Sequence, residues 1–285
     1  MKSVVVTGVS SGIGRGTLNV LIERGWHVFG SVRKIEDIRS LKDQYGDSFT
    51  PLLMDIQDES AVLSAAELVR EALGDRNLDG LVNNAGGSFS DPLLLQSVAD
   101  FRKQIDINLV GMFAVIRAFA PLLGASSSHS DAKGRIVNLS SVGGTFGPPF
   151  LGAYSAAKHG VEGLSESLRR ELMLVGIDVI VIGPGSVRTA IWDKADAAST
   201  DHLTGTIWEH PFLKFKAAMA DGGRKGLPPE AIGQAVEVAL TARKPRVRYA
   251  VLPRREYLTN LLPRFLPARW VDRALARQFG LLSSS

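Results

Sequence analysis

The chain has 285 residues, of which 45% are hydrophobic and 22% charged, enough apolar surface for the core of one large or two small domains. It contains no cysteine, which excludes a disulfide framework, a thiolate metal site and a cysteine nucleophile. Its five histidines show no metal-ligand spacing, so we predict no metal site. No uninterrupted apolar run reaches the roughly 18 to 20 residues that span a bilayer. A strand-like stretch begins at Ser3 and leaves no room for a signal peptide, so we expect a cytoplasmic protein.

The net charge of +4 is unevenly distributed. The segment 242–285 holds ten Lys and Arg residues against two acidic residues, so it carries +8 and the preceding 241 residues carry −4. A nucleic-acid-binding protein would usually spread a basic face over its folded body, so we expect no nucleic-acid partner. The pattern favours a local basic surface for lipid headgroups or for an acidic partner.

The first elements form a strand-helix-strand unit. The β-branched run Ser3–Thr7 is too short for a helix, and it stops at a glycine- and serine-rich turn that ends at Gly14. Apolar spacing after this turn predicts a helix that closes at Gly25, and 26–32 returns as a second strand.

The alternation continues along the chain. Helices are predicted at 35–45, 59–73, 98–123 and 153–175, and strands at 49–54, 78–82, 135–139 and 179–182. Continuous apolar strands separated by helices indicate a parallel sheet covered on both faces. We therefore predict an α/β fold over 1–285: a single Rossmann-type domain with a doubly wound parallel sheet, helices on both faces and a C-terminal extension. The stretch 124–134 is expected to be a surface loop.

Two regions after the last of these strands depart from the pattern. Residues 186–228 scatter aromatic side chains among polar residues and glycines, and because long loops are often lids, we assign this stretch to a substrate lid. The alternative is a helical segment that merely covers the sheet edge. Residues 252–285 form the basic C-terminal extension.

The glycine-rich turn is a candidate anion site. A turn between a first strand and a helix exposes backbone N–H groups and the positive helix end to a pyrophosphate. The spacing of Gly8, Gly12 and Gly14 departs from GxGxxG, and no Lys-Ser/Thr pair follows as in a Walker A loop. A tight turn without a ligand is the alternative.

The end of the second strand bears on the choice of cofactor. Arg33 and Lys34 stand where an NAD site normally places a carboxylate for the ribose 2′-hydroxyl. Two cations favour a 2′-phosphate, since a guanidinium can bond it bidentately. NADP(H) is therefore expected rather than NAD(H); the alternative is that both cations only solvate a helix start.

Tyr154 and Lys158 are the candidate chemical pair. They lie at i and i+4 on a predicted helix, so both side chains face the same way. An adjacent ammonium would stabilise a phenolate and lower the pKa of the tyrosine from about 10 toward neutrality, as a general base requires. An exposed helical pair without chemistry is the alternative for this motif taken alone.

Several motifs in register resemble the short-chain dehydrogenase/reductase family. They occur in that family's order and spacing over about residues 3–190: Gly8-xxx-Gly12-x-Gly14, Asn83-Asn84-Ala85-Gly86, Asn108, Ser140-Ser141, Tyr154-xxx-Lys158 and Pro184-Gly185-Ser186-Val187-Arg188-Thr189. The resemblance implies hydride transfer between a nicotinamide and a CH–OH or carbonyl group, with Tyr154 as acid and base. It implies that Ser141 holds the substrate oxygen, that Lys158 also binds the nicotinamide ribose, and that Asn108 bends its helix and holds a relay water. Ser141 is preferred over Ser140 because it precedes Tyr154 by the family's thirteen residues, while Ser140 would point to the opposite face.

The resemblance also implies a set of cofactor contacts. They would come from the pyrophosphate turn, from Arg33 and Lys34 at the 2′-phosphate, from the end of the third strand near the adenine, from the Asn-Asn-Ala-Gly motif, from the chemical pair and from the Pro-Gly motif at the nicotinamide. The residues are Gly8, Ser10, Ser11, Gly12, Ile13, Gly14, Arg33, Lys34, Asp55, Ile56, Asn83, Ala85, Gly86, Tyr154, Lys158, Pro184, Gly185, Val187 and Thr189.

The aromatic lid suits an apolar substrate. The second strand and the tail look like those of family members that act on steroids, retinoids and other lipophilic alcohols or ketones. One rival is a 3-oxoacyl-thioester reductase, whose acidic carrier protein would meet the basic tail. The other is a non-catalytic NADP(H)-sensing binding protein, against which the intact Ser-Tyr-Lys set argues.

Partners are expected at two surfaces. The long helices at 98–123 and 153–175 resemble those through which family members pair, so we expect a homodimer or a homotetramer. The tail places apolar residues beside arginines and is a candidate for peripheral contact with anionic lipid. The favoured alternative is a C-terminal element packed on the lid or on a second subunit, with its arginines in water.

Overall fold

A seven-stranded parallel sheet runs through the part of the chain that the computed structural model describes, residues 1–125, 133–261 and 265–282. Its order is β3-β2-β1-β4-β5-β6-β7. The strands are β1 (Ser3–Val6), β2 (His27–Val32), β3 (Phe49–Leu53), β4 (Gly80–Asn83), β5 (Arg135–Leu139), β6 (Asp178–Pro184) and β7 (Arg248–Val251). The order reverses direction between β1 and β4, which makes this the predicted doubly wound α/β fold.

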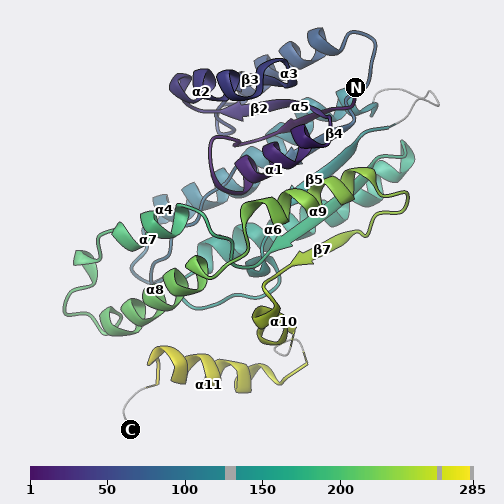
Figure 1. Ribbon diagram of the computed structural model, residues 1–285. Helices are drawn as coiled ribbons and strands as arrows, with labels where there is room; N and C mark the ends of the chain where they lie inside the picture. Colours follow the sequence, from purple (N-terminus) through teal and green to yellow (C-terminus); the bar gives the residue numbers. More distant parts are fainter. Residues whose placement is uncertain (126–132, 262–264, 283–285) are drawn as a thin grey trace.

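Helices cover both faces of the sheet (Figure 1). One layer holds α1 (Gly12–Glu23), α2 (Ile35–Tyr45) and α9 (Pro229–Thr241), and the other holds α3 (Glu59–Leu73), α5 (Gly111–Phe119) and α6 (Gly152–Glu171). Successive strand residues point to opposite layers, so Val4 and Val6 join the first core and Val5 joins the second. Two apolar cores therefore sandwich the sheet, and strand burial on both faces explains the unbroken apolar runs in the sequence.

The elements α9 and β7 were not predicted. Helix α9 packs on α1 at close range, because a Cβ on Gly16 would lie 2.6 Å from Pro229 and one on Gly233 would lie 2.8 Å from the carbonyl oxygen of Gly16. Strand β7 pairs with β6 at the sheet edge, where its residues are only partly buried. An edge strand of four residues that begins with an arginine lacks the apolar run by which the inner strands were found.

The long helix predicted at 98–123 is interrupted. It comprises α4 (Val98–Ile105), a π-helical turn (Asp106–Val110), α5 and a 3₁₀ turn (Ala120–Leu123). By length and composition this segment could cross a membrane, a property that the search for unbroken apolar runs did not detect. Met112, Val115 and Phe119 are nevertheless buried in the core beneath the sheet, so in this fold α5 is a core helix.

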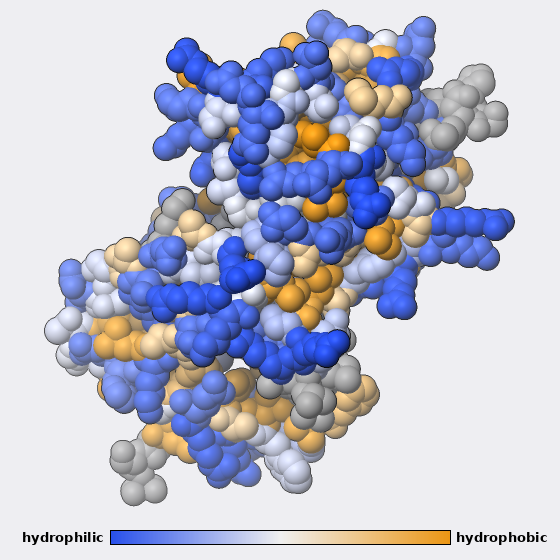
Figure 2. Space-filling view, viewed as in Figure 1, coloured by the Kyte–Doolittle hydropathy of each residue, from blue (hydrophilic) through white to orange (hydrophobic). Residues whose placement is uncertain are grey.

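Residues 186–228 are largely helical, with α7 (Ile191–Ala197), a 3₁₀ turn (Asp201–Leu203) and α8 (Glu209–Arg224). The C-terminal extension adds α10 (Arg254–Leu261) and α11 (Ala268–Phe279). A third apolar cluster joins α8 to α11 and includes Phe212, Phe215 and Phe279. Figure 1 shows α10 and α11 beneath the end of β7, and Figure 2 shows that hydrophobic residues reach this face of the molecule in separate patches. Most of the predicted surface loop 124–134 lies outside the described residues.

Candidate active site

The glycine-rich turn connects β1 to α1 at the carboxyl end of the sheet. Gly8 and Gly12 have φ values of +73° and +57°, which side chains rarely adopt. Gly14 lies against the carbonyl oxygen of Gly8, so any Cβ there would overlap it. Ser31 at the end of β2 holds the turn by accepting hydrogen bonds from the N–H of Gly8 (Oγ, 2.9 Å) and of Val9 (carbonyl, 3.0 Å).

The first turn of α1 offers donors to an anion. Ser11 stands at the N-cap, and among the described residues its side chain makes no capping hydrogen bond with α1. Ser10 and Ser11 are exposed, and Gly12 and Ile13 are half-buried. The helix terminus, the open amides and the side-chain-free glycines fit a pyrophosphate, so the turn can hold a dinucleotide.

The Asn-Asn-Ala-Gly motif divides its side chains between sheet and turn. The Asn84 amide donates to the carbonyl oxygens of Thr7 (2.8 Å) and Gly8 (3.2 Å), so it braces the glycine turn. Asn83, predicted beside the cofactor, is buried and donates instead to Asn138 Oδ1 at 2.8 Å. The side chain of Asn83 therefore ties β4 to β5 and lies inside the protein rather than at the surface of the site. Ala85, whose N–H donates to Thr7 Oγ1, follows β4 beside Gly8, and Gly86 follows it next to the side chain of Asn108.

Arg33 and Lys34 extend from the end of β2 into solvent. Both side chains are exposed, and neither makes a hydrogen bond or ion pair with another described residue. The two cations therefore stand free for a phosphate next to the turn. Asp55 and Ile56 follow β3; the carboxylate of Asp55 accepts from the N–H of Gln57, and Ile56 packs on α5.

The Pro-Gly motif leaves β6 and returns over the glycine turn. The N–H of Gly185 donates to the carbonyl oxygen of Val251, and Val187 pairs with Leu227 in a short parallel bridge. Thr189 then reaches Gly12, where a Cβ would lie 3.3 Å from the threonine methyl. The loop predicted to hold the nicotinamide thus lies beside the turn predicted to hold the pyrophosphate.

Ser141 and Tyr154 meet at the centre of the site. Ser141 caps a 3₁₀ turn (Val142–Gly144) after β5, where its Oγ accepts from the N–H of Gly143 at 3.0 Å. Burial raises the pKa of Tyr154 above its usual value of 10, and a hydrogen bond with Ser141 partly opposes that rise. Ser140 is buried and its Oγ points away toward Gly144, which supports the choice of Ser141.

Lys158 is buried one helical turn after Tyr154. Its Nζ donates to the carbonyl oxygen of Leu139 at 2.8 Å and lies 5.9 Å from the centre of the Tyr154 ring. Burial lowers the pKa of Lys158 to about 8, an effect that the nearby carboxylate of Glu162 partly opposes. The expectation that Lys158 brings the pKa of Tyr154 toward neutrality is therefore wrong for this structure, because burial dominates and the ammonium is directed at a carbonyl.

Asn108 lies within the π-helical turn, buried beneath the Asn-Asn-Ala-Gly loop. Its amide donates to the carbonyl oxygens of Gly87 (2.8 Å) and Gln104 (3.0 Å), and its Oδ1 accepts from the N–H of Gly87 (3.2 Å). The side chain thus joins the helix to the loop that follows β4, and the π turn is the helix distortion that was expected there.

A cluster of buried aromatic side chains packs beside Tyr154. Phe150 is a non-glycine residue with φ of +63°, and its ring lies 5.4 Å from those of Phe212 and Phe215. Phe279 of α11 packs on Phe215 at 5.5 Å, and Tyr154 lies against this cluster. Helix α11 packs on α8, as the favoured alternative for the tail predicted. Its contact with the cluster at Tyr154 was not predicted, because Phe215 and Phe279 lie 64 positions apart and meet only in the folded chain.

Comparison with known proteins extends over nearly the whole chain. A family model described as "short chain dehydrogenase" matches residues 2–200. An NADPH-dependent 3-dehydrocapnine reductase of Ornithobacterium rhinotracheale is 35% identical over 273 residues, which are 96% of this chain and 95% of that protein. Retinol dehydrogenase 16 of Mus musculus is 32% identical over 263 residues, covering 87% of this chain and 80% of that protein. A short-chain dehydrogenase/reductase from Burkholderia phymatum, solved in complex with NAD, has the same fold, with a TM-score of 0.76 at 24% identity over 96% of this chain and 95% of that one.

Proposed function

Because this chain belongs to the short-chain dehydrogenase family, we propose that it transfers a hydride between NADP(H) and a lipophilic alcohol or ketone, with Tyr154 as acid and base. Its relatives are oxidoreductases, and the fold is that of nicotinamide-binding members of the family. The observation that carries the proposal is that Ser141 and Tyr154 lie together, each within 3.5 Å of the Cβ position of Gly143, with the ammonium of Lys158 5.9 Å from the centre of the tyrosine ring.

The protein side chains would divide the chemistry among them. The nicotinamide supplies or accepts the hydride when it is bound. In ketone reduction Ser141 donates a hydrogen bond to the carbonyl oxygen, and Tyr154 gives that oxygen a proton as negative charge develops on it. The raised pKa of Tyr154 keeps its hydroxyl protonated, which suits the reductive direction. Lys158 supplies positive charge beneath the site, and Asn108 holds the loop after β4 in place.

The free cations at the end of β2 support NADP(H) over NAD(H). A 2′-phosphate would give Arg33 and Lys34 an ionic partner that they lack among the described residues. One relative is named as NADPH-dependent, while one structural neighbour was solved with NAD, so the preference rests on these two residues.

The aromatic cluster supports a lipophilic substrate. Phe150, Phe212, Phe215 and Phe279 pack beside Tyr154 and make the surroundings of its ring apolar, with each phenylalanine at most 7% exposed. Two relatives bear names that refer to a retinol and to a dehydrocapnine. A steroid- or retinoid-like alcohol/ketone pair suits these apolar surroundings.

The test is NADPH oxidation, compared with NADH, against steroid, retinoid, aliphatic and carrier-linked β-ketoacyl carbonyls. We expect turnover of one lipophilic class with NADPH, and loss of at least about 1,000-fold in kcat for Tyr154→Phe, with NADPH binding retained. Turnover of the carrier-linked substrate alone would replace the proposal by a 3-oxoacyl-thioester reductase. Tight NADPH binding without turnover of any class would replace it by a cofactor-sensing protein.

We also propose peripheral contact between α11 and anionic lipid for an otherwise cytoplasmic protein. Phe265 and Trp270 are 78% and 63% exposed, beside the exposed cations Arg269 and Arg273. Exposed aromatic side chains and arginines that lie close together in the sequence are typical of segments that bind an anionic bilayer. Flotation with phosphatidylserine vesicles should carry the wild type, while Trp270→Ala with Arg273→Gln stays behind; equal flotation of the two would refute the contact.

A further inference from the structure

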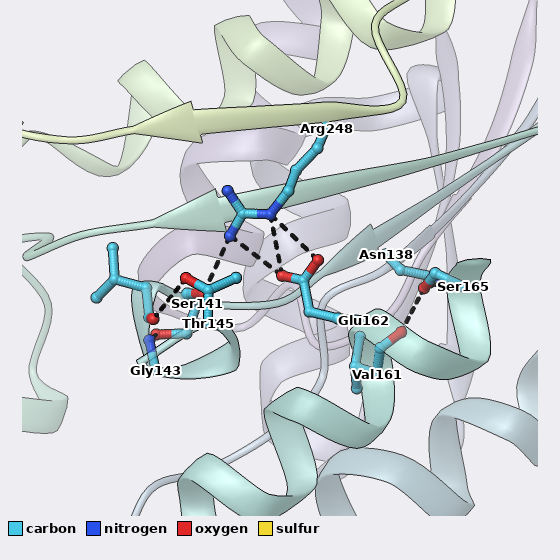
Figure 3. Close-up of polar contacts among 9 residues, drawn as sticks. Asn138, Ser141, Gly143, Thr145, Val161, Glu162, Ser165 and Arg248 are labelled. Carbon is cyan, nitrogen blue, oxygen red and sulfur yellow. Dashed lines mark hydrogen bonds and ion pairs between the residues drawn. The ribbon is translucent and has the colours of Figure 1, made fainter. Parts of the chain in front are cut away.

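Arg248 of β7 reaches across the end of the sheet to α6, where it meets Glu162. Its Nε lies 3.2 and 3.1 Å from the two carboxylate oxygens of Glu162, and its Nη2 lies 3.1 Å from Oε1 (Figure 3). The two side chains are 25% and 19% exposed, so the pair is largely withdrawn from water. A pair with two parallel donors has a defined geometry, which a surface ion pair lacks.

Two glycines make room for this pair. A Cβ on Gly183 in β6 would overlap the guanidinium of Arg248, and a Cβ on Gly144 after β5 would lie 3.1 Å from Cγ of Glu162. The pair therefore fills the space between β6, the turn after β5 and α6. This space separates the loop that carries Ser141 from the helix that carries Tyr154.

Both members of the pair contact the proposed catalytic elements. Arg248 Nη2 donates to the main-chain carbonyl oxygen of Ser141 at 3.4 Å (Figure 3). Glu162 lies on α6 one turn beyond Lys158 and two turns beyond Tyr154, on the same side of the helix. Its carboxylate raises the pKa of Lys158 against the lowering that burial causes.

Stability alone is a weak reason for two charges at this place. Withdrawing both ions from water costs free energy that their attraction only partly recovers, and apolar replacements are often as stable. The pair does something that an apolar contact could not do: it fixes a carbonyl oxygen by a directed hydrogen bond and places a negative charge near a buried ammonium.

We propose that Arg248 and Glu162 are positioning residues for the proposed hydride transfer: they hold the main chain of Ser141 against α6 and balance the charge of Lys158. The inference rests on the proposed function. Arg248 fixes the loop, and thereby the direction of the Ser141 hydroxyl toward Tyr154. Glu162 anchors Arg248 and keeps Lys158 in its charged form.

The variants separate charge from geometry. Glu162→Gln removes the negative charge, Arg248→Gln removes the positive charge, and Arg248→Lys keeps the charge but loses the two-pronged contact. The matched control is Arg135→Gln: Arg135 of β5 also pairs with an acid, Asp178, at 3.4 Å and donates to the carbonyl oxygen of Ala239, and its side chain is 19% exposed. Arg135 makes none of its described contacts with Ser141, Tyr154 or Lys158.

The first measurement needs no substrate. In protein labelled with [ε-¹³C]lysine, the Lys158 resonance, assigned with Lys158→Arg, is followed through a pH titration of the cofactor-free protein. The groups facing Lys158 are Tyr154 and Glu162 from α6, the Leu139 carbonyl from β5 and, through Glu162, Arg248 from β7. Glu162→Gln should lower the pKa of Lys158 and Arg248→Gln should raise it, each by on the order of half a unit. Shifts in the same direction, or none in either variant, would overturn the charge-balancing role.

The second measurement uses the best carbonyl substrate of the wild type. Arg248→Gln and Arg248→Lys should each lose about 10-fold in kcat, with KM and the dissociation constant of NADPH changed less than about 3-fold, while Arg135→Gln keeps wild-type values. Equal losses in Arg135→Gln, or losses confined to KM, would overturn the positioning role. If the wild type reduces no carbonyl, the proposed function fails, and the NMR titration still decides whether the pair acts on Lys158.

Discussion

At Lys158, burial and the need for a positive charge oppose each other. The pKa of this ammonium lies at about 8 in the folded protein, against 10.5 for an ordinary lysine, because the side chain is withdrawn from water. Between these two pH values the unfolded chain binds more protons than the folded one, so the free energy of unfolding rises with pH there. Below about pH 8 the folded protein bears the full cost of the buried charge.

We expect Lys158→Met to remove this dependence. As the pH rises from 8 to 10.5, the free energy of unfolding of the wild type should increase by up to about 3 kcal/mol relative to that of Lys158→Met. Urea denaturation at several pH values measures it, with the exposed Lys244→Met as control. Parallel pH profiles for wild type and Lys158→Met would contradict a lowered pKa.

The preference for NADP(H) over NAD(H) can be tested at Arg33 and Lys34, which the fold does not need. Because Arg33 and Lys34 are exposed, Arg33→Ser with Lys34→Gln should fold normally and reduce the NADPH/NADH ratio of kcat/KM by about 10- to 100-fold, the loss expected for one or two charge-assisted hydrogen bonds. The variant leaves the preceding residue, Val32, unchanged, because Val32 is only 2% exposed and a new charge there would be buried in the core. An unchanged ratio would mean that the 2′ position of the ribose lies elsewhere.

At the scale of the elements, α11 packs close to Tyr154 although the two are far apart in the sequence. One face of this helix buries Phe279 against Phe215, next to Tyr154, while Trp270 on the same helix remains exposed. The extension is thus packed on α8, as part of the apolar cluster that contacts Tyr154, rather than an appended tail. It also joins the catalytic loops through α10, where Glu256 Oε2 accepts a hydrogen bond from the N–H of Ser186 at 3.0 Å.

Truncating the buried aromatic residue should affect substrate binding selectively. Phe279 is buried, so Phe279→Ala leaves a cavity beside Phe215 and loosens the cluster that packs on Tyr154; KM for a lipophilic carbonyl should rise about 3- to 10-fold while NADPH binding stays unchanged. Trp270→Ala, on the exposed face of the same helix, is the control for helix stability and should leave KM as it is. Steady-state kinetics on both variants decide the point, and equal KM values in Phe279→Ala and wild type would exclude α11 from the substrate site.

For the molecule as a whole, strands β1 to β6 were predictable and the edge strand β7 was not. The inner strands are largely buried and leave apolar runs that can be read without a structure, and the other edge strand, β3, keeps Phe49 and Leu52 buried although it is partly exposed. Tyr154 and Lys158 were found by their spacing, and Ser141 and Asn108 by the resemblance to the family; the fold brings Ser141, Tyr154 and Lys158 together. The side-chain role of Asn83, the pKa values, Arg248 and the contribution of Phe279 depend on which atoms meet across distant segments. Spacing along the chain carries no record of such contacts.

Association of subunits is a further property of the whole molecule, and we expect it at α4 and α5. Val98, Phe101, Val110 and Phe113 are exposed apolar residues along these two helices and the π turn between them. A second copy would cover them, which is why we propose a homodimer or homotetramer. Phe113→Glu should shift the mass measured by light scattering to that of a monomer, whereas Leu94→Glu, in the exposed segment before α4, serves as the control. A monomeric wild type would refute the proposal.

Because β7 lies late in the sequence, the proposed site is completed only near the end of synthesis. Every residue proposed to do chemistry has left the ribosome before Arg248 is made, yet the main chain of Ser141 has no guanidinium to hold it until then. Until β7 arrives, β6 is an open, apolar edge of a parallel sheet, the kind of edge on which nascent chains aggregate. The site is completed and the edge of β6 is covered at the same stage, when β7 has been synthesised. We expect a chain that ends before β7 to leave the apolar edge of β6 exposed and to aggregate.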